Sequence, residues 1–486
     1  MCQICDATQA ALATIDPCYC GTPETQMAMR RIEADLNRRA MIGGTAAIVG
    51  MFAGFGLSSG TLRAQTPGRP LLLTNLRLFD GVRRTMQDGL DILVQGDRVT
   101  ALPRRGDGPA DAERIDCGGR SVIPGLIDVH WHATLIAVSQ LAALTQDVGF
   151  IHLMAGREAG ATLMRGFTTV RDVGGPVFGL AMAIDRGALP GPRIFPAGAM
   201  ISQTAGHGDF RLLHSVPRMP GDPADYTETS GVAAIADGAD EVLRRAREQL
   251  MRGASQIKIM AGGGVSSLYD PLDTAQFTER EVRAAVEAAE DWGTYVCAHV
   301  YTPKGIQRCL AAGVRSIEHG QLADEPTVKM MADKGAWWSL QPFLNDEDAN
   351  PKSDPAQKAK QEEVGAGTER AFALAQKHKV NWAFGTDALF LGPRGAEKQG
   401  RQLAKLARFM APLDALYRAT GAAGDLLAMS GARAPYQGKL GRIEPNALAD
   451  LLVVDGDPAT SLAWLEDPAA NLKLIMKGGQ IHKRVL

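Results

Sequence analysis

Five side chains that can bind a metal ion stand at the ends of short apolar runs, which are typical of buried strands. His130 and His132 are one residue apart in DVHWH, so on an extended strand they point to the same side. His299, His319 and Asp387 each end a later apolar run. Imidazole and carboxylate groups are common zinc ligands. Each residue alone would more simply be a hydrogen-bonded core residue, but the five together predict a metal site.

Lys258 lies in the apolar run QIKIMA, in which it is the single charged residue. An ammonium group that faces a protein interior is costly unless it is paired or modified. A place on the polar edge of the strand, with the amine in water, is the simpler alternative. In the interior, a deprotonated Lys258 joined to CO₂ would become a carbamate whose two oxygens bridge a pair of metal ions.

Short apolar runs alternate with amphipathic segments along most of the chain, which is typical of repeated βα units and a parallel sheet. Helices are expected at residues 240–252 and 278–291, where apolar residues recur every three or four positions. We predict an α/β fold, a (β/α)₈ TIM barrel over residues 119–435, whose chemistry lies at the carboxyl ends of its strands. The eight candidate strands are residues 122–129, 167–173, 193–201, 256–260, 294–299, 316–319, 337–341 and 381–387.

The segments on either side of the barrel contain short β-like runs broken by Gly-Asp and Gly-Gly turns, as in ILVQGDRV and IMKGGQIH. Residues 71–118 and 436–486 are therefore predicted to pair into one small β-sandwich. Residues 345–369 show no strong periodicity at their start and are expected to form a loop or lid over the site.

Composition narrows the classes of partner. The 486-residue chain has a formal net charge of -2, with 45% hydrophobic and 22% charged residues, so no strong field of one sign favours binding to nucleic acid. A small-molecule substrate is expected instead, and a homo-oligomer is left open. Four of the seven cysteines lie before residue 21, which does not indicate a disulfide framework across the body of the protein.

The first 65 residues are expected to be a leader. Arg38 and Arg39 precede residues 40–62, which carry no charge and are rich in Gly and Ala, and this order resembles a twin-arginine export signal. Six glycines make residues 40–62 a poor membrane helix, so no stable membrane span is expected in the mature protein. The predicted location is the periplasm or the outside of the cell, and the alternative is the cytoplasm.

Over residues 71–483 the sequence resembles the amidohydrolase superfamily. The resemblance is carried by SVIPGLIDVHWH, GFTTVRDVGG, ISQTAGHGD, QIKIMAGGGVSS, CAHVYTPKGI, SIEHG, FGTDA and GKLGRIEPNALADLLVVDGDP. The runs ISQTAGHGD and IKIMAGGG are most similar to the branch that contains Xaa-Pro and Xaa-Arg dipeptidases and ochratoxin-hydrolysing amidases. The resemblance implies a metal-dependent hydrolase of carbon–nitrogen bonds.

The resemblance also implies two divalent metal ions, expected to be Zn²⁺. In the family, the HxH pair and the aspartate of the last strand hold one ion, the histidines of the fifth and sixth strands hold the other, and a carboxylated lysine bridges them. The corresponding residues are His130, His132 and Asp387 for the first ion, His299 and His319 for the second, and Lys258 for the bridge.

The implied reaction is hydrolysis of a linear amide in a dipeptide, an N-acyl amino acid or an ochratoxin-like compound. A hydroxide that bridges the ions would attack the carbonyl carbon, because metal-bound water loses its proton near pH 7. Asp387 would pass the proton to the leaving amine. His207 would donate a hydrogen bond to the developing oxyanion, and Tyr301 would bind the polar end of the substrate. A loop-stabilising role for His207 and ordinary packing for Tyr301 are the alternatives.

Other residues are expected to support the site. Arg171 and Asp172, after the second predicted strand, would form a pair that orients the ligands. Trp131 and residues 337–338 would supply apolar surface near the barrel mouth.

Two other functions remain open. A cyclic-amide or lactone hydrolase of the imidazolonepropionase-like type would use the same ions to open a ring. A non-catalytic scaffold is disfavoured, since a scaffold has no physical need to gather four histidines, a lysine and an aspartate.

The leader interpretation predicts that changing Arg38 and Arg39 together to Lys blocks export, because that signal is read through the arginine pair. Fractionation of a Gram-negative host, followed by immunoblotting, measures how much mature protein reaches the periplasm. Unchanged periplasmic protein would show that the chain leaves by another route.

Overall fold

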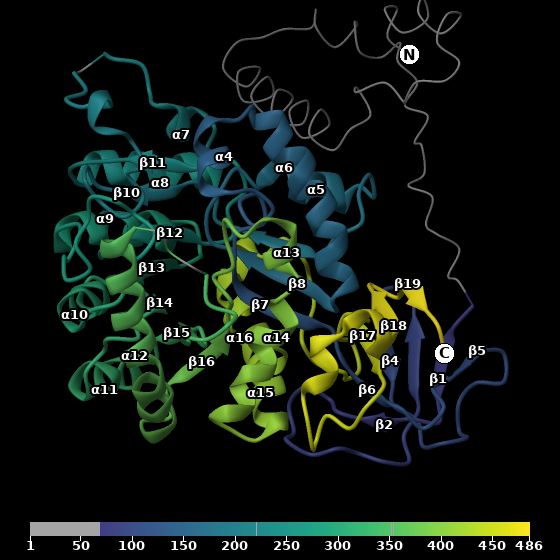
Figure 1. Ribbon diagram of the computed structural model, residues 1–486. Helices are drawn as coiled ribbons and strands as arrows, with labels where there is room; N and C mark the ends of the chain where they lie inside the picture. The colour runs from purple at the N-terminus through teal and green to yellow at the C-terminus, as the bar shows by residue number, and fades with distance from the viewer. Residues whose placement is uncertain (1–68, 220, 351, 353) are drawn as a thin grey trace, which may run out of the picture. The chain divides into compact units, whose positions relative to one another are not determined.

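The computed structural model describes residues 69–486 except 220, 351 and 353, so the predicted leader and its cysteines lie outside the described residues. The described part is a mixed α/β fold in which strands and helices alternate (Figure 1). Among its helices, we find none that combines the length and the apolar character needed to cross a membrane.

Two parallel sheets carry the strands that end near the predicted site. Their orders are β11-β10-β12-β13-β14-β15-β16 and β7-β8-β9. The bounds are β7 Leu126–Trp131, β8 Phe167–Asp172, β9 Arg193–Pro196, β10 Met200–Ser202, β11 Ala233–Ile235, β12 Ile257–Met260, β13 Val296–Val300, β14 Ser316–His319, β15 Trp337–Leu340 and β16 Asn381–Phe384. Just after β16, the backbone N–H of Asp387 donates to the carbonyl of His130 in β7 (2.9 Å). The last strand therefore lies beside the first, as a barrel requires, although no continuous ladder joins the two sheets among the described residues.

Two of the predicted strands are divided in the structure. Residues 122–129 are interrupted at Gly125, and the part before the break is β6 (Ser121–Pro124), which pairs with β17 (Leu451–Val454) in a different sheet. Residues 193–201 are split into β9 and β10 around Gly198, whose φ of 80° is incompatible with an extended strand. Strand β11 has no counterpart among the predicted strands.

Helices lie outside the parallel strands, and Figure 1 shows α9, α10 and α11 along the outer side of β12 to β15. The two predicted helices are confirmed as α8 (Ala239–Met251) and α9 (Glu279–Asp291), which pack against each other. Thr278 and Glu281 close the start of α9 in a reciprocal capping box. The other helices are α4 Gln140–Thr145, α5 Val148–Met164, α6 Phe178–Asp185, α7 Tyr226–Thr229, α10 Pro303–Ala311, α11 Glu325–Asp333, α12 Pro355–Lys377, α13 Gly392–Ala396, α14 Gln399–Ala404, α15 Pro412–Arg418, α16 Gly421–Leu427 and α17 Pro468–Asn471.

The prediction of a loop over residues 345–369 is wrong from Pro355 onward, because α12 begins there. The side chain of Asp354 accepts the N–H of Gln357, and Pro355 occupies the first turn, where its missing N–H costs nothing. Val364 and Phe372 are among the buried residues of the helix. The Asp-Pro start signal was present in the sequence, and the irregular segment is limited to the residues before it.

Two smaller sheets contain the two ends of the described chain. Their orders are β4-β3-β1-β5 and β19-β18-β17-β6-β2. The remaining bounds are β1 Leu71–Thr74, β2 Arg77–Leu78, β3 Ile92–Gln95, β4 Arg98–Ala101, β5 Glu113–Asp116, β18 Leu472–Lys477 and β19 Gln480–Arg484. One apolar cluster contains residues of both sheets, such as Ile92 and Met476, and Figure 1 shows the purple strands of the start beside the yellow strands of the end. The two sheets therefore share one apolar cluster, and the β-sandwich stays a prediction.

A fully buried ion pair lies beneath the strand ends. Nη2 of Arg171 in β8 donates to both carboxylate oxygens of Glu318 in β14, at 2.7 and 2.8 Å. Nη1 of Arg171 also reaches the hydroxyls of Tyr295 (3.1 Å) and Ser316 (3.3 Å). Burial alone would raise the pKa of Glu318, but Arg171 and a histidine neighbour hold it well below its usual value. The pair joins strands that belong to the two different parallel sheets.

The predicted pairing of Arg171 with Asp172 is therefore wrong in its partner. Successive residues of a strand point to opposite sides, so Arg171 reaches Glu318 while the Asp172 carboxylate accepts the backbone N–H groups of Ala133 and Gly174, at 2.7 and 3.1 Å. Burial raises the pKa of Asp172 to about 7. Both residues still hold backbone near the predicted ligands in place.

We expect Glu318→Gln to lower the free energy of unfolding by about 3–5 kcal/mol, because the amide leaves Arg171 as a buried charge without its counter-ion. The measurement is the urea midpoint of the metal-free protein, after circular dichroism has shown native secondary structure. Glu287→Gln is the matched control, since Glu287 forms an exposed ion pair on α9 with Arg283 and should cost less than about 1 kcal/mol. Equal losses in the two variants would contradict a special role for the buried pair.

Candidate functional site

All eight residues predicted for the site line one inner cavity. They come from the ends of β7, β12, β13 and β14 and from the segments after β10 and β16. The residues are His130, His132, His207, Lys258, His299, Tyr301, His319 and Asp387. The structure therefore brings the whole predicted set together in one cavity.

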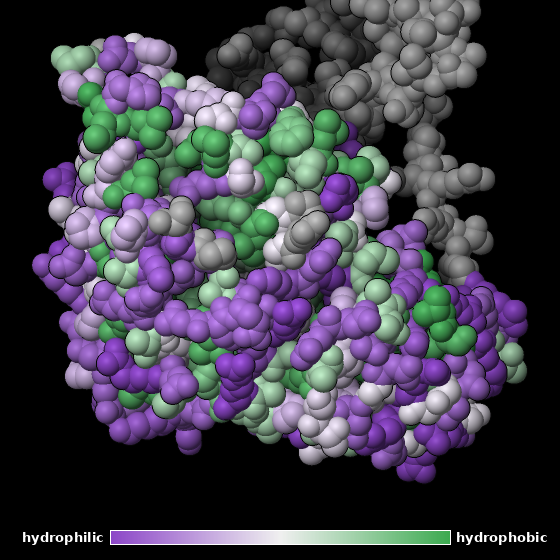
Figure 2. Space-filling model, viewed as in Figure 1, coloured by the Kyte–Doolittle hydropathy of each residue, from purple (hydrophilic) through white to green (hydrophobic). Residues whose placement is uncertain are grey.

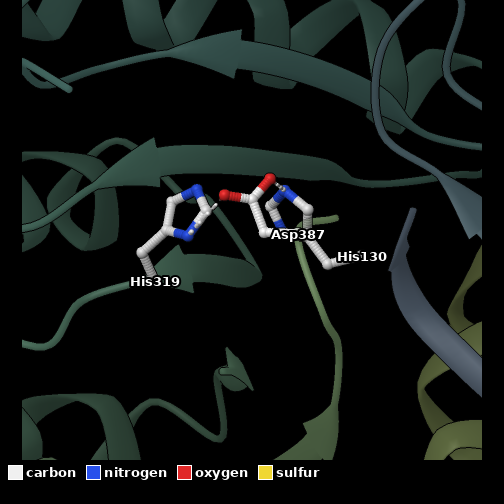
Figure 3. A group of neighbouring side chains, drawn as sticks. All are labelled: His130, His319 and Asp387. Carbon is white, nitrogen blue, oxygen red and sulfur yellow. Dashed lines mark ion pairs between the residues drawn. The ribbon is translucent and has the colours of Figure 1, made fainter. Parts of the chain in front are cut away.

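His130, His319 and Asp387 form the group best placed to hold an ion, since their ligand atoms all lie within 4.8 Å of one another. Figure 3 shows the Asp387 carboxylate between the two imidazole rings. One of its oxygens is 3.2 Å from Nε2 of His130, and the other is 4.0 Å from Nδ1 of His319. Nε2 of His132 is also within 3.3 Å of Asp387. Nε2 of His130 is fully buried and has no hydrogen-bond partner among the described residues, and a bound metal ion would satisfy it.

Three of the histidines are oriented by an acceptor on the far side of the ring. The pairs are His130 Nδ1 with Glu318 Oε2 (2.8 Å), His132 Nδ1 with Gly174 O (2.9 Å) and His299 Nε2 with Gly263 O (3.2 Å). Because a carboxylate or a carbonyl can only accept, the nitrogen facing it carries the proton. The second nitrogen of each ring then has a free lone pair, which is how histidines that bind metal ions are commonly held.

Burial and neighbouring charges put these groups in the forms that bind metal ions. Burial, with the histidines and Lys258 nearby, holds the pKa of His299 and His319 well below the usual value, so both rings are neutral. Burial alone would raise the pKa of Asp387, but His130 and His319 hold it well below the usual value. Burial also lowers the pKa of Lys258, which favours the neutral amine that reacts with CO₂.

The backbone at two candidate ligands is strained. His319 and Asp387 have φ values of 71° and 52°, in the left-handed region that residues other than glycine rarely adopt. Close packing helps to hold Asp387 there, since a Cβ on Gly385 would lie 2.5 Å from the Cβ of His130. Only glycine at this position lets the end of β16 approach β7 closely enough for Asp387 to reach His130.

His207 is confined on both faces of its ring. It stacks on His299 with the ring centroids 4.1 Å apart, and a Cβ on Gly264 would lie 1.9 Å from its Cε1. Nδ1 of His207 is 2.7 Å from Ser267 Oγ and 3.4 Å from Asp270 Oδ2. His207 therefore makes the contact with a loop that a purely structural role would require. It also lines the inner cavity, as a catalytic role would require.

An outer cavity adjoins the inner one. The two share five lining residues, namely Val265, Ser266, Tyr301, Asp387 and Leu389. The outer walls come from residues 342–350, from Lys352, from α12 and from residues 386–402. Figure 2, viewed in the same direction as Figure 1, shows a recess with apolar walls beside α13. A substrate can therefore place its reacting bond near Asp387 and its remaining atoms in the outer cavity.

The tryptophans predicted to line the mouth do not do so. Trp131 and Trp338 are buried in two separate apolar clusters, and Trp337 packs against a third. Large apolar rings are costly to expose to water, so they are usually buried in the core. Phe343 and Leu344 supply part of the apolar wall instead.

Sequence reasoning missed Glu318, although the same signal that singled out Lys258 was present, namely a charged residue inside an apolar strand. In β14, Ser316 and Glu318 lie on the same side, and their side chains are 2.7 Å apart. His319 leaves the strand conformation, and its ring reaches the cavity. The alternation of side chains alone would have placed Glu318 and His319 on opposite sides.

Comparison with known proteins identifies the family. Residues 121–482 match the amidohydrolase family. The ochratoxinase of Aspergillus niger is 34% identical over 334 residues, which are 66% of this chain and 66% of that protein, just under two thirds of its length.

Two solved structures are similar over their whole length. One is described as a prolidase complexed with N-methylphosphonate-L-proline. It is 34% identical with a TM-score of 0.78, and the match covers 85% of this chain and 100% of the prolidase chain. The other is described as a Xaa-Pro dipeptidase with bound methionine in the active site. It is 30% identical with a TM-score of 0.74, and the match covers 85% of this chain and 100% of the dipeptidase chain. From the extent of these matches, the chain belongs to the amidohydrolase family, in the branch that includes ochratoxinase and Xaa-Pro dipeptidases, and it is a hydrolase that acts on amide or peptide bonds.

Proposed function

We propose that this protein is a binuclear metal-dependent amidohydrolase that cleaves the linear amide bond of N-acyl or N-aroyl amino acids and of dipeptides. The preferred substrates are those whose amino acid has an apolar or aromatic side chain, and ochratoxin-type amides are among them. The observation that carries the proposal is the inner cavity, where neutral imidazoles, an ionised aspartate and a buried lysine meet. Two relatives are described with an amino acid or an amino-acid derivative bound, which supports an amino acid as one product.

The residues present fit two divalent ions, with zinc as the proposed metal. His130, His132 and Asp387 would hold one ion, His299 and His319 the other, and a carbamate on Lys258 would bridge them. The tightest described group contains one histidine from each proposed set, with Asp387 between them, which supports two adjacent sites. When bound, the ions would supply an activated water as nucleophile and polarise the scissile carbonyl.

The chain's own residues supply the remaining steps. Asp387, held ionised by His130 and His319, accepts a proton from the attacking water and delivers it to the leaving amine. Nδ1 of His207 faces the Ser267 hydroxyl and, at 3.4 Å, the Asp270 carboxylate, so the oxyanion role requires a proton on Nε2, the other ring nitrogen. That proton is then available to the developing oxyanion, a contact worth on the order of 3 kcal/mol when well aligned.

The metal proposal predicts about two equivalents of zinc per chain in protein made in zinc-replete medium, and a large loss in Lys258→Ala, because the bridge between the ions is gone. Elemental analysis measures the metal, and circular dichroism shows whether the fold survives. Lys329→Ala is a matched control, since Lys329 is exposed on α11 and pairs with Asp333. A short carboxylic acid added to Lys258→Ala should restore part of the metal content. Wild-type metal content and activity in Lys258→Ala would exclude the bridge.

The substrate proposal predicts a higher kcat/KM for N-benzoyl-phenylalanine than for a lactam of similar size, because the outer cavity extends the site for a linear substrate. The measurement is initial-rate kinetics with fully metal-loaded enzyme. A preference for the lactam would replace the linear-amide proposal with a ring-opening activity of the imidazolonepropionase-like type.

A further inference from the structure

Lys352 lies in the wall of the outer cavity, at its junction with the inner one. Its Nζ donates to the hydroxyl of Ser266 at 3.0 Å, and Ser266 lines both cavities. Its side chain is half-buried. A hydroxyl is a neutral partner, and no carboxylate of the described residues lies within ion-pair distance of this amine. Lys352 is therefore a partly desolvated positive charge with no ion-pair partner in direct contact among the described residues.

Neighbouring lysines around the same cavity are matched by protein acceptors. Lys405 lies 2.9 Å from an oxygen of Asp348, and Lys398 lies 3.7 Å from the other oxygen of the same carboxylate. Lys360 donates to three backbone carbonyls of residues 264–270, at 2.7 to 3.4 Å. These contacts hold the cavity walls together. Lys352 differs from them because its amine has a single neutral hydroxyl as partner, which leaves its other N–H groups for a group that enters the cavity.

Lys352 lies on the side of the outer cavity that adjoins the inner one, because Ser266, the partner of its amine, lines both cavities. Burial lowers the pKa of Lys352, and the Asp387 carboxylate acts in the opposite direction. An arriving anion would offset the cost of keeping an ammonium group partly out of water. Beside Lys352, the cavity wall carries the apolar side chains of Phe343, Leu344 and Val364.

We propose that Lys352 is the counter-ion for the free carboxylate of the substrate, so that the outer cavity selects amides whose leaving group is an amino acid. This inference rests on the proposed function. An amino-acid leaving group carries its carboxylate on the carbon next to the scissile nitrogen. When that bond lies at Asp387, the carboxylate falls near the junction with Lys352, and the apolar wall is left for the side chain.

The test compares N-benzoyl-phenylalanine with its primary C-terminal amide, which has the same scissile bond and no charge. In Lys352→Gln we expect kcat/KM for the acid to fall by about 10- to 100-fold, mainly through KM, because a charged hydrogen bond is lost. For the amide we expect less than about a threefold change, and Lys352→Arg should recover part of the loss on the acid. Lys358→Gln is the control, since Lys358 is exposed on α12.

Calorimetry of L-phenylalanine binding gives a readout that does not depend on turnover. The affinity for L-phenylalanine should fall in Lys352→Gln and stay unchanged in Lys358→Gln. A wild type that hydrolyses no linear amide would overturn the proposed function, and the inference with it. Equal kcat/KM values for acid and amide in the wild type would overturn only the role of Lys352. An equal loss on both substrates in Lys352→Gln would have the same meaning, because it would show a structural effect.

Discussion

A charge buried away from water must find a partner, and the contact between Arg171 and Glu318 is where this constraint acts most strongly. Glu318 has no exposed surface, yet Arg171 keeps it ionised and joins it to a strand of the other sheet. The same carboxylate accepts Nδ1–H of His130 and leaves Nε2 of that ring for the cavity. Asp387 then meets His130 at 3.2 Å. The position of the candidate metal-binding group is thus set by an ion pair that lines neither cavity.

Burial and close packing together determine the protonation states and the positions of the side chains in the inner cavity. Burial makes His299 and His319 neutral and favours a neutral Lys258. Asp387 stays charged because the histidines around it compensate for burial. An interior with these protonation states binds divalent ions without first releasing protons from the imidazoles. The strained backbone at His319 and Asp387 is the cost of placing both groups at one point.

The inner and outer cavities are formed by different parts of the structure. The inner cavity is formed largely by residues at strand ends, which the hydrogen-bonded sheets hold rigidly. The outer cavity is formed mainly by residues 342–350, Lys352, α12 and residues 386–402, which come from the connections around the last two parallel strands. Such connections can change without disturbing the sheets. Relatives of one fold family can thus differ in the substrates that their names describe.

From the sequence alone, the residues of the inner cavity could be chosen, because strand periodicity and chain order place His130, His132, His299, His319 and Asp387 at equivalent strand ends. Thr278 likewise marked the start of α9. The tertiary structure alone decided that Arg171 pairs with Glu318, that two predicted strands are divided, that Trp131 packs in the core and that Lys352 faces a cavity with no ion-pair partner in direct contact among the described residues. Local patterns report which way a side chain leaves its own strand or helix. Which group it meets depends on segments far away in the sequence, and the packing of the whole chain determines that contact.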